Sequence, residues 1–431
     1  GINLGSLISQ FFCPLLAVSV GWWAGFGLAA LGMTCSWALF QFDGGRLDGY
    51  GERPANAPAS KDWIIYVCAM LAVPLAIFLF WNLMNYVAPP AGSGIVGYVS
   101  SLPIMGKFLF GTFLISVPAI LIWSFVAGSR TEFQMMVAAM VLIVFNVVFW
   151  TLFEQAGSSL TLFAERNTVL EIGWTAPLFA AFRANPITYY LFFALIIGGI
   201  AWLAFWFFAW GEEAATRRKM GIATAVIAVI AFIGMHFARL GGFGSEPVYV
   251  MPAGQTQIFN ALFIVILAPL MSVLWNVLAK RGLEPPIPIK FGLALMGVGA
   301  GFLFLVWGAS FAGPNYQVGL AWLAGLYLIH SIAELCISPV GLSMITKLSI
   351  ARIVGMMMGV WFLSISVAQY VAGAVAQVAS VETVGGQVTN LKVSLETYLG
   401  VFTTIGWVAV GIGAVLLVLA FPLKYLMHGV K

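Results

Sequence analysis

Residues 318–346 read VGLAWLAGLYLIHSIAELCISPVGLSMIT, and this stretch sets the class of protein to which the chain can belong. A helix needs about 20 mostly apolar residues to cross the ~30 Å hydrocarbon layer of a bilayer. Glu334 is the one formally charged residue here, near the middle. An ionised carboxylate at that depth costs roughly 2.5–3.5 kcal/mol, so such residues are functional candidates by default. The stretch therefore predicts a membrane-spanning helix that carries a functional acid.

The composition of the whole chain agrees with a membrane protein. Of 431 residues, 62% are hydrophobic and 8% are charged, whereas soluble domains carry about 25% charged residues. These values exclude a water-soluble globule and an intrinsically disordered chain. The apolar runs also lack the alternation of an outer-membrane barrel. The net charge of +4 is small and dispersed, which argues against nucleic-acid binding. We therefore predict an all-α polytopic membrane protein.

Twelve segments are long and apolar enough to span a bilayer. They lie at about 2–20, 24–42, 63–88, 106–128, 133–164, 187–210, 220–238, 255–279, 289–312, 318–346, 353–379 and 397–427. One set of alternate loops, together with the C-terminus, holds 14 Lys and Arg residues, and the other set holds 5. Because basic residues are retained on the cytoplasmic side, both chain ends are predicted to face the cytoplasm.

Two acids lie within predicted spans, Glu334 and, in the 133–164 segment, Glu154. No Lys or Arg occupies the interior of any predicted span. A buried acid without a basic partner takes up a proton, so these groups either exchange protons during a working cycle or pair with bases outside this sequence. The alternative is a protonated acid that bonds a neighbouring helix as structural glue. Trp150 shares a helix face with Glu154, and Ser338 stands one turn after Glu334.

Further polar and aromatic candidates are Asn3, Asn260 and Trp361. Each has a structural alternative, because an amide can bridge two helices and an indole can fill space. His330 precedes Glu334 by four residues, which allows a proton relay, although a histidine that bridges helices is the better interpretation.

Other chemistry finds little support in the sequence. No His, Cys, Asp or Glu cluster has metal-ligand spacing, and no nucleophile–base pair or cofactor motif occurs, so neither a metal site nor an enzyme is predicted. The glycine-rich run 292–301 lacks the ending of a phosphate-binding loop. Its Gly297-x-x-x-Gly301 spacing instead predicts close helix packing.

Several stretches together resemble the proton-dependent oligopeptide transporters of the major facilitator superfamily. Residues 149–159 (FWTLFEQAGSS) are similar to the FWxxxEQxxSS signature of that family's seventh helix, and residues 334–343 (ELCISPVGLS) to the ELCxSPxGLS motif of its tenth. Weaker similarities are FNALFI at 259–264 with the eighth helix, Gly355-Met356 and Trp361-Phe362 with the eleventh, and GINLG at 1–5 with the opening of the fifth.

The resemblance implies a major-facilitator fold of two helical bundles around a central site, with an incomplete N-terminal bundle and a complete C-terminal one. Helices one to four of the family, with the ExxER motif and a lysine, have no counterpart. The implied organisation is 1–42 for the last two helices of the N-terminal bundle, 43–130 for a linker with an extra helical hairpin, 131–168 for helix seven, 183–240 for an inserted helical hairpin, and 250–431 for helices eight to twelve.

For function, the resemblance implies a proton-coupled symporter that imports di- and tripeptides by alternating access, in the inner membrane of a bacterium. The implied substrate-binding residues are Asn3, Trp150, Asn260, Glu334, Ser338 and Trp361. Glu154 and Glu334 would serve proton coupling and gating. No cofactor is implied besides the coupling proton, and the partners are small peptides, protons and the lipid bilayer. The alternatives are a transporter of another amine-bearing small solute and a non-transporting fragment.

Overall fold

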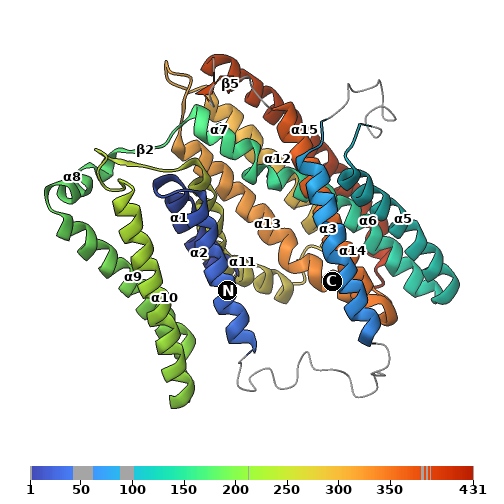
Figure 1. Ribbon diagram of the computed structural model, residues 1–431. Helices are drawn as coiled ribbons and strands as arrows, with labels where there is room; N and C mark the ends of the chain where they lie inside the picture. Colours follow the sequence, from blue (N-terminus) through green and yellow to red (C-terminus); the bar gives the residue numbers. More distant parts are fainter. Residues whose placement is uncertain are drawn as a thin grey trace.

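The computed structural model describes residues 2–41, 62–87, 101–211, 213–379, 383–384, 387–388 and 390–430. The long helices are α1 (Ile2–Ser19), α2 (Trp22–Gln41), α3 (Asp62–Met84), α5 (Ile104–Ala127), α6 (Arg130–Phe153), α9 (Pro186–Ala209), α10 (Ala214–Leu240), α11 (Ile258–Lys280), α12 (Ile287–Ala309), α13 (Leu320–Leu348), α14 (Val354–Val378) and α15 (Leu391–Leu426). They run up and down between two ends of the molecule (Figure 1).

Short elements connect the long helices. The helical ones are η2 (Glu154–Gly157), α7 (Ser159–Asn167), η3 (Gly173–Thr175), α8 (Ala176–Ala184), η4 (Ala253–Gln257) and η5 (Ala351–Ile353). The strands are β1 (Thr168–Val169), β2 (Glu171–Ile172), β3 (Tyr249–Val250), β4 (Val318–Gly319), β5 (Thr383–Val384) and β6 (Gln387–Val388). They form three two-stranded pairs, β1 parallel to β4, β2 antiparallel to β3, and β5 antiparallel to β6.

The all-α membrane architecture predicted from the composition is confirmed. Among the described residues, eleven helices are long and apolar enough to cross a membrane. These eleven helices correspond to every predicted span except 24–42. That span forms the 20-residue helix α2, which is not among the eleven. Much of the predicted linker, namely 42–61 and 88–100, lies outside the described residues.

The predicted span at 133–164 is confirmed, because 130–167 is long and apolar enough to cross a membrane, but its helix is interrupted at Glu154. α6 ends at Phe153, a 3-10 turn follows, and Ser158 takes φ −131° and ψ −95°, which no helix accommodates. A break exposes carbonyls that apolar surroundings cannot satisfy. The Gln155 side chain meets this need, donating to the Thr151 carbonyl at 3.0 Å. A span of this length is expected to tilt or kink, and the structure locates the break at Glu154.

Two apolar cores hold the helices together. The larger joins residues of α5, α6 and α7 with α12 to α15. The smaller joins α1 with α8, α9 and α10 and includes Phe12, Phe182 and Tyr189. In Figure 1 the α9–α10 hairpin stands at one side of the molecule, while α3, α5 and α6 stand at the other. Many large apolar side chains remain exposed, as expected of surfaces that face lipid rather than water.

Close packing by small residues places α13, the helix that carries Glu334. A Cβ atom added to Gly297 would lie 3.0 Å from the Ala333 Cβ, and one added to Gly301 would lie 2.4 Å from the His330 Cδ2. The two glycines therefore let α12 approach α13 closely, which confirms the predicted role of the Gly297-x-x-x-Gly301 spacing.

One end of the molecule gathers the loops that carry few basic residues. The strand pairs bring β1 beside β4 and β2 beside β3. At this end Arg166 donates to the Tyr398 hydroxyl at 3.0 Å, and Arg239 donates to the Phe182 carbonyl at 3.2 Å. These two arginines therefore hold chain segments together, because each donates a hydrogen bond to a different part of the chain.

Candidate functional site

The centre of the candidate site is the Glu334 carboxylate on α13, which faces α11. The Asn260 Nδ2 donates to its Oε2 at 3.1 Å. Both side chains are half-buried. Among the ion pairs of the described residues none involves Glu334. The carboxylate is therefore held in place by an amide rather than by a base.

Ser331 fixes the amide from the other side. The Asn260 Nδ2 also donates to the Ser331 Oγ at 3.0 Å, and the Ser331 Oγ lies 2.7 Å from the Tyr327 carbonyl. Ser331 is fully buried, one turn of α13 before Glu334. Because both protons of the amide nitrogen are engaged, the Asn260 Oδ1 and the Glu334 Oε1 are the acceptors that these bonds leave unused.

The second predicted acid, Glu154, lies where α6 gives way to η2. It is half-buried, and the Gln369 Nε2 of α14 lies 3.4 Å from its Oε1. Its carboxylate is close enough to that of Glu334 to interact with it electrostatically. The fold therefore brings the two acids, 180 residues apart in the sequence, toward a common interior region.

Aromatic rings join α6 to α13 beside these acids. Trp150 packs edge-to-face on Phe153, with 5.3 Å between ring centroids, and Phe153 lies 6.0 Å from the His330 ring. The Trp150 Nε1 is buried and has no hydrogen-bond partner among the described residues. His330 is buried and its Nε2 lies 3.0 Å from the Val298 carbonyl of α12. His330 thus bridges α13 to α12, as the structural interpretation of this residue expected.

Trp361 of α14 is buried against α13. A Cβ atom added to Gly341 would lie 2.3 Å from the Trp361 Cη2. The glycine therefore makes room for the indole one turn beyond Ser338. The Ser338 side chain itself is exposed, next to Pro339 in the interior of α13.

Asn3 lies apart from the other predicted residues. It is half-buried in the first turn of α1, and no hydrogen bond joins it to them within the part of the chain that the structure describes. The structure thus brings Asn260, Glu334 and Glu154 together, with Trp150 beside them. The binding roles of Asn3, Trp150, Asn260, Glu334, Ser338 and Trp361, and the coupling roles of Glu154 and Glu334, remain predictions.

A polar seam between α6 and α14 was not predicted from the sequence. The Asn146 Nδ2 donates to the Ser364 Oγ at 2.9 Å, and the Thr151 Oγ1 lies 3.3 Å from the Ala368 carbonyl. The Gln155 Nε2 reaches the Ala372 carbonyl at 3.2 Å. Polar residues recur at 151, 155 and 159, and this spacing of four was the available signal, because residues four apart lie on one side of a helix.

No group of three or more potential metal ligands occurs among the residues that the structure describes.

Comparison with known proteins gives a consistent result. The model of the POT family matches residues 1–58 and 246–391. Asn3, Asn260, Glu334, Ser338 and Trp361 lie within the matched residues, whereas Trp150 and Glu154 lie outside them.

Matches to individual relatives extend across nearly all of this chain. The dipeptide and tripeptide permease A of Pectobacterium carotovorum is 27% identical over 421 residues, which are 98% of this chain and 64% of the permease. The permease A of Escherichia coli K12 is 26% identical over 98% of this chain and 64% of its own length. A di-/tripeptide transporter of Lactococcus lactis is 26% identical, with 100% and 68% covered. The chain thus spans about two-thirds of the length of these relatives.

Solved structures with the same arrangement of helices are those of POT transporters. A peptide transporter POT in complex with sulfate superposes with a TM-score of 0.61 at 23% identity, covering 100% of this chain and 67% of that one. A POT family transporter in complex with 5-aminolevulinic acid gives a TM-score of 0.62 at 18% identity, with 98% and 68% covered. At these identities the likeness shows the fold. The family match, the relatives and the shared fold therefore show that the chain is similar to transporters of the POT family.

Proposed function

We propose that the chain works in proton-coupled import of di- and tripeptides by alternating access. The observation that carries this proposal is the Glu334 carboxylate, which sits half-buried inside an apolar helix and is held by Asn260 rather than by a base. The names of the Pectobacterium, Escherichia and Lactococcus relatives, which are permeases or transporters of di- and tripeptides, support the class of substrate.

In this proposal Glu334 and Asn260 receive the amino terminus of the peptide. An ammonium group has three donors and no acceptor. The acceptors that the site's own hydrogen bonds leave unused are the Glu334 Oε1 and the Asn260 Oδ1. A carboxylate and an amide oxygen side by side suit such a cation, because a charge-assisted hydrogen bond is about twice as strong as a neutral one.

Proton coupling would use the same acid together with Glu154. Protonation would neutralise a carboxylate and so release a cation that the carboxylate holds, such as the ammonium group of the peptide. The loss of this attraction would change the relative stability of the outward-facing and inward-facing states. Glu154 lies at the break between α6 and α7, where a change in charge acts on the joint between two helical segments. The membrane potential, worth about 2.3 kcal/mol per charge per 100 mV, would add to the pH gradient.

The remaining assignments follow the family pattern. Trp150 and Trp361 would line side-chain pockets, with Ser338 and Asn3 beside the peptide. Residues 1–42 would supply two helices of the N-terminal bundle, 43–130 the linker, 131–168 and 250–431 the C-terminal bundle, and 183–240 an inserted hairpin. The protein would reside in the bacterial inner membrane with its C-terminus in the cytoplasm, which agrees with the 14-to-5 distribution of basic residues.

Uptake by proteoliposomes tests the proposal. The purified chain should accumulate labelled dialanine when an inward proton gradient is applied, and an uncoupler should stop accumulation. Glu334→Gln should abolish it. The control Glu165→Gln changes an exposed acid of α7 and should leave uptake unchanged. Uncoupler-sensitive uptake by Glu334→Gln at the level of the unchanged chain would reject the proposal. Specific dialanine binding without uptake by the unchanged chain would favour the non-transporting fragment.

A second candidate substrate is another small amine. One solved POT transporter of the same fold is in complex with 5-aminolevulinic acid, which carries an amine but no peptide bond. Competition of labelled dialanine by unlabelled dipeptides, by free alanine and by 5-aminolevulinic acid separates the two candidates. Displacement by dipeptides at a much lower concentration than by either amine supports a peptide transporter.

A further inference from the structure

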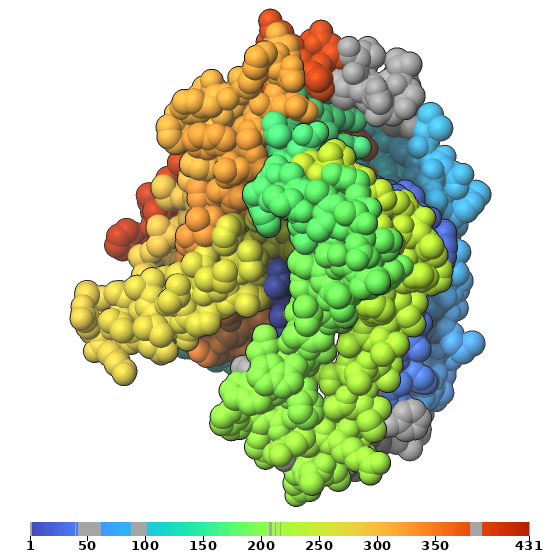
Figure 2. All heavy atoms as spheres, turned by 90° about the vertical axis from the view of Figure 1, so that its left-hand side faces the viewer, coloured from blue at the N-terminus to red at the C-terminus, as the bar shows by residue number. Residues whose placement is uncertain are grey.

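A long apolar cavity lies between α1 and α9 and is separate from the candidate functional site. Its volume is about 900 Å³, and none of the six predicted substrate-binding residues lines it. In the space-filling view a hollow opens between the α9–α10 hairpin, in green, and α11, in yellow, with dark-blue atoms of the N-terminal helix inside it (Figure 2).

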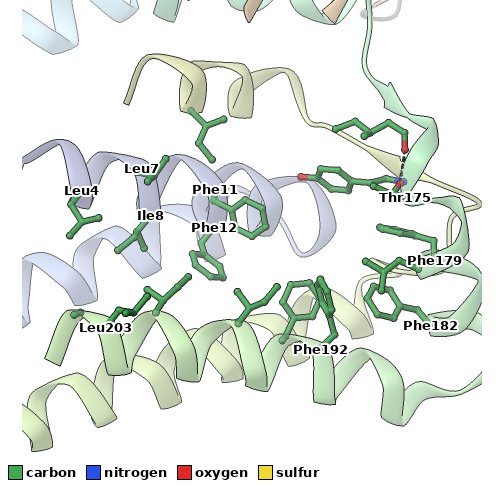
Figure 3. Close-up of a pocket in the computed structure, with 18 of the residues that line it drawn as sticks. Leu4, Leu7, Ile8, Phe11, Phe12, Thr175, Phe179, Phe182, Phe192 and Leu203 are labelled. Atoms are coloured by element: carbon green, nitrogen blue, oxygen red, sulfur yellow. Dashed lines mark hydrogen bonds between the residues drawn. The ribbon is translucent and has the colours of Figure 1, made fainter. Parts of the chain in front are cut away.

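The cavity wall is built from two helix faces and closed at one end by α8. Leu4, Ile8 and Phe12 of α1 point toward Phe192 and Leu203 of α9, and Phe179 and Phe182 of α8 close one end (Figure 3). Polar side chains here are already engaged, since the Thr175 Oγ1 accepts from the Tyr249 backbone N–H at 2.8 Å. The wall therefore offers hydrocarbon contacts rather than hydrogen bonds.

The dimensions of the cavity fit an acyl chain. The α9 residues that line it run from Phe192 to Trp206. At 1.5 Å of rise per residue this stretch is about 21 Å long, which exceeds the roughly 15 Å depth of one leaflet, half the ~30 Å hydrocarbon layer.

The other end of the cavity meets a smaller pocket that has one basic residue in its wall. Trp206 lines both the apolar cavity and a smaller one of about 290 Å³, whose wall also includes Trp210 and Arg217. The two indoles pack edge-to-face with 4.5 Å between their centroids. Tryptophan is typical of the membrane–water boundary, where its apolar ring and polar N–H face different surroundings.

Arg217, which lines this pocket, begins a run of three basic residues. Arg217, Arg218 and Lys219 are exposed in the first turns of α10, shortly after the exposed acid Glu213. Cations near a helix N-terminus oppose the helix dipole, so their position there does not stabilise α10. Basic clusters beside a membrane-spanning helix attract anionic lipid headgroups. The run also belongs to the loops predicted to face the cytoplasm.

We propose that the α9–α10 hairpin and α1 form a binding site for an anionic phospholipid. One acyl chain lies in the cavity between α1 and α9, and the phosphate lies beside Trp210 and the basic run 217–219. The lipid fills the cavity between the hairpin and α1, so it secures the hairpin to the rest of the protein.

Native mass spectrometry of the delipidated chain tests this site. The probes are palmitoyl-oleoyl phosphatidylglycerol and the phosphatidylcholine with the same chains. The unchanged protein should retain phosphatidylglycerol preferentially. The double substitution Arg218→Gln and Lys219→Gln should weaken its binding by about tenfold or more. The matched control is Lys280→Gln with Arg281→Gln, an exposed basic pair at the end of α11, which should retain the lipid.

A second pair of variants tests the acyl chain. Ile196→Trp fills the cavity and should reduce binding of phosphatidylglycerol. Its neighbour Leu195 is 75% exposed and does not line the cavity, so Leu195→Trp should leave binding unchanged. Equal binding of both lipids, or full binding by Ile196→Trp, would overturn the proposal. The proposal would also be overturned if the delipidated chain formed a dimer and Ile196→Trp dissociated it. The cavity would then be occupied by a second copy of the chain rather than by a lipid.

Discussion

At the scale of single residues, the orientation of the Asn260 side-chain amide determines which hydrogen-bond acceptors the site offers. The Asn260 Nδ2 donates to both Ser331 and Glu334, so the amide oxygen and one carboxylate oxygen remain as acceptors. The amide could equally have bridged two helices without any acid nearby, which is the structural role that many intramembrane amides have. Its contact with a carboxylate at mid-span makes it a binding candidate.

We expect Asn260→Ala to weaken peptide binding while the protein stays folded. The change removes a hydrogen bond that orients Glu334 and an acceptor for the substrate. Hydrogen bonds to charged groups contribute roughly 1.5–3 kcal/mol, so the half-saturating concentration of dialanine should rise by roughly tenfold or more. Initial rates of uptake measure this change. Ser343→Ala, at an exposed position on α13, the helix of Glu334, serves as the control, and an unchanged half-saturating concentration in Asn260→Ala would argue against its role.

At the scale of helices, two kinds of contact position the site. Glycines let neighbouring helices pack closely, since Gly341 makes room for Trp361 and Gly301 makes room for His330. Polar contacts fix how the helices are aligned along their axes, since Asn146 and Thr151 of α6 and Gln155 of η2 each form a hydrogen bond with α14. Together these contacts set the distances between α6, α13 and α14, and hence the place of both acids.

Gly341→Ala should destabilise the protein. The added methyl would lie 2.3 Å from the Trp361 Cη2, so the indole must move. Overpacking of this kind costs about 1–3 kcal/mol, which should lower the melting temperature in detergent. Gly359→Ala on α14, where the added atom meets nothing within 4 Å, should leave it unchanged or slightly raised. Equal melting temperatures for the two variants would contradict this account.

A double-mutant cycle should detect the seam between α6 and α14. Asn146→Ala and Ser364→Ala each remove one partner of a buried 2.9 Å hydrogen bond. Such bonds in membrane proteins average about 0.6 kcal/mol of coupling, with a maximum of about 1.7. The free energy of unfolding of the two single variants, the double variant and the unchanged protein gives the coupling. A second cycle that pairs Asn146→Ala with Ser366→Ala, at an exposed position on α14, should give no coupling free energy.

At the scale of the whole molecule, short connections join elements that are distant in the sequence. Asn167, which is fully buried at the end of α7, donates to the carbonyls of Tyr316 and Leu391 at 3.0 and 3.1 Å and accepts from the Ser394 Oγ at 2.7 Å. One side chain thereby connects α7, the loop before β4 and the start of α15. The adjacent β1–β4 pair adds backbone bonds at the same place.

Asn167→Ala should loosen this end of the molecule as a unit. The change removes hydrogen bonds to the Tyr316 and Leu391 carbonyls and from the Ser394 hydroxyl, each of which contributes roughly 0.5–1.5 kcal/mol. We expect a lower melting temperature and faster hydrogen exchange at 313–319 and 391–395, with exchange in α9 and α10 unchanged. Faster exchange across all helices to the same degree would instead indicate global destabilisation.

The sequence by itself determined the class of protein and the candidate acids. Apolar runs of sufficient length admit one stable solution in a bilayer, because a helix satisfies all its own backbone hydrogen bonds. An acid inside such a run is costly enough to stand out, so Glu154 and Glu334 could be found without a structure. The close packing at Gly297 and Gly301 was predictable for a related reason, since small residues four apart mark a helix contact.

The tertiary structure decided what composition cannot encode. The break at 154–157, the seam of Asn146, Thr151 and Gln155, and the partner of Glu334 all depend on which helix lies opposite. An apolar helix can turn any face toward its neighbours at nearly equal hydrophobic cost, because lipid tails are as apolar as its own side chains. The cavity between α1 and α9 arises in the same way, from the packing of segments that lie nearly 200 residues apart.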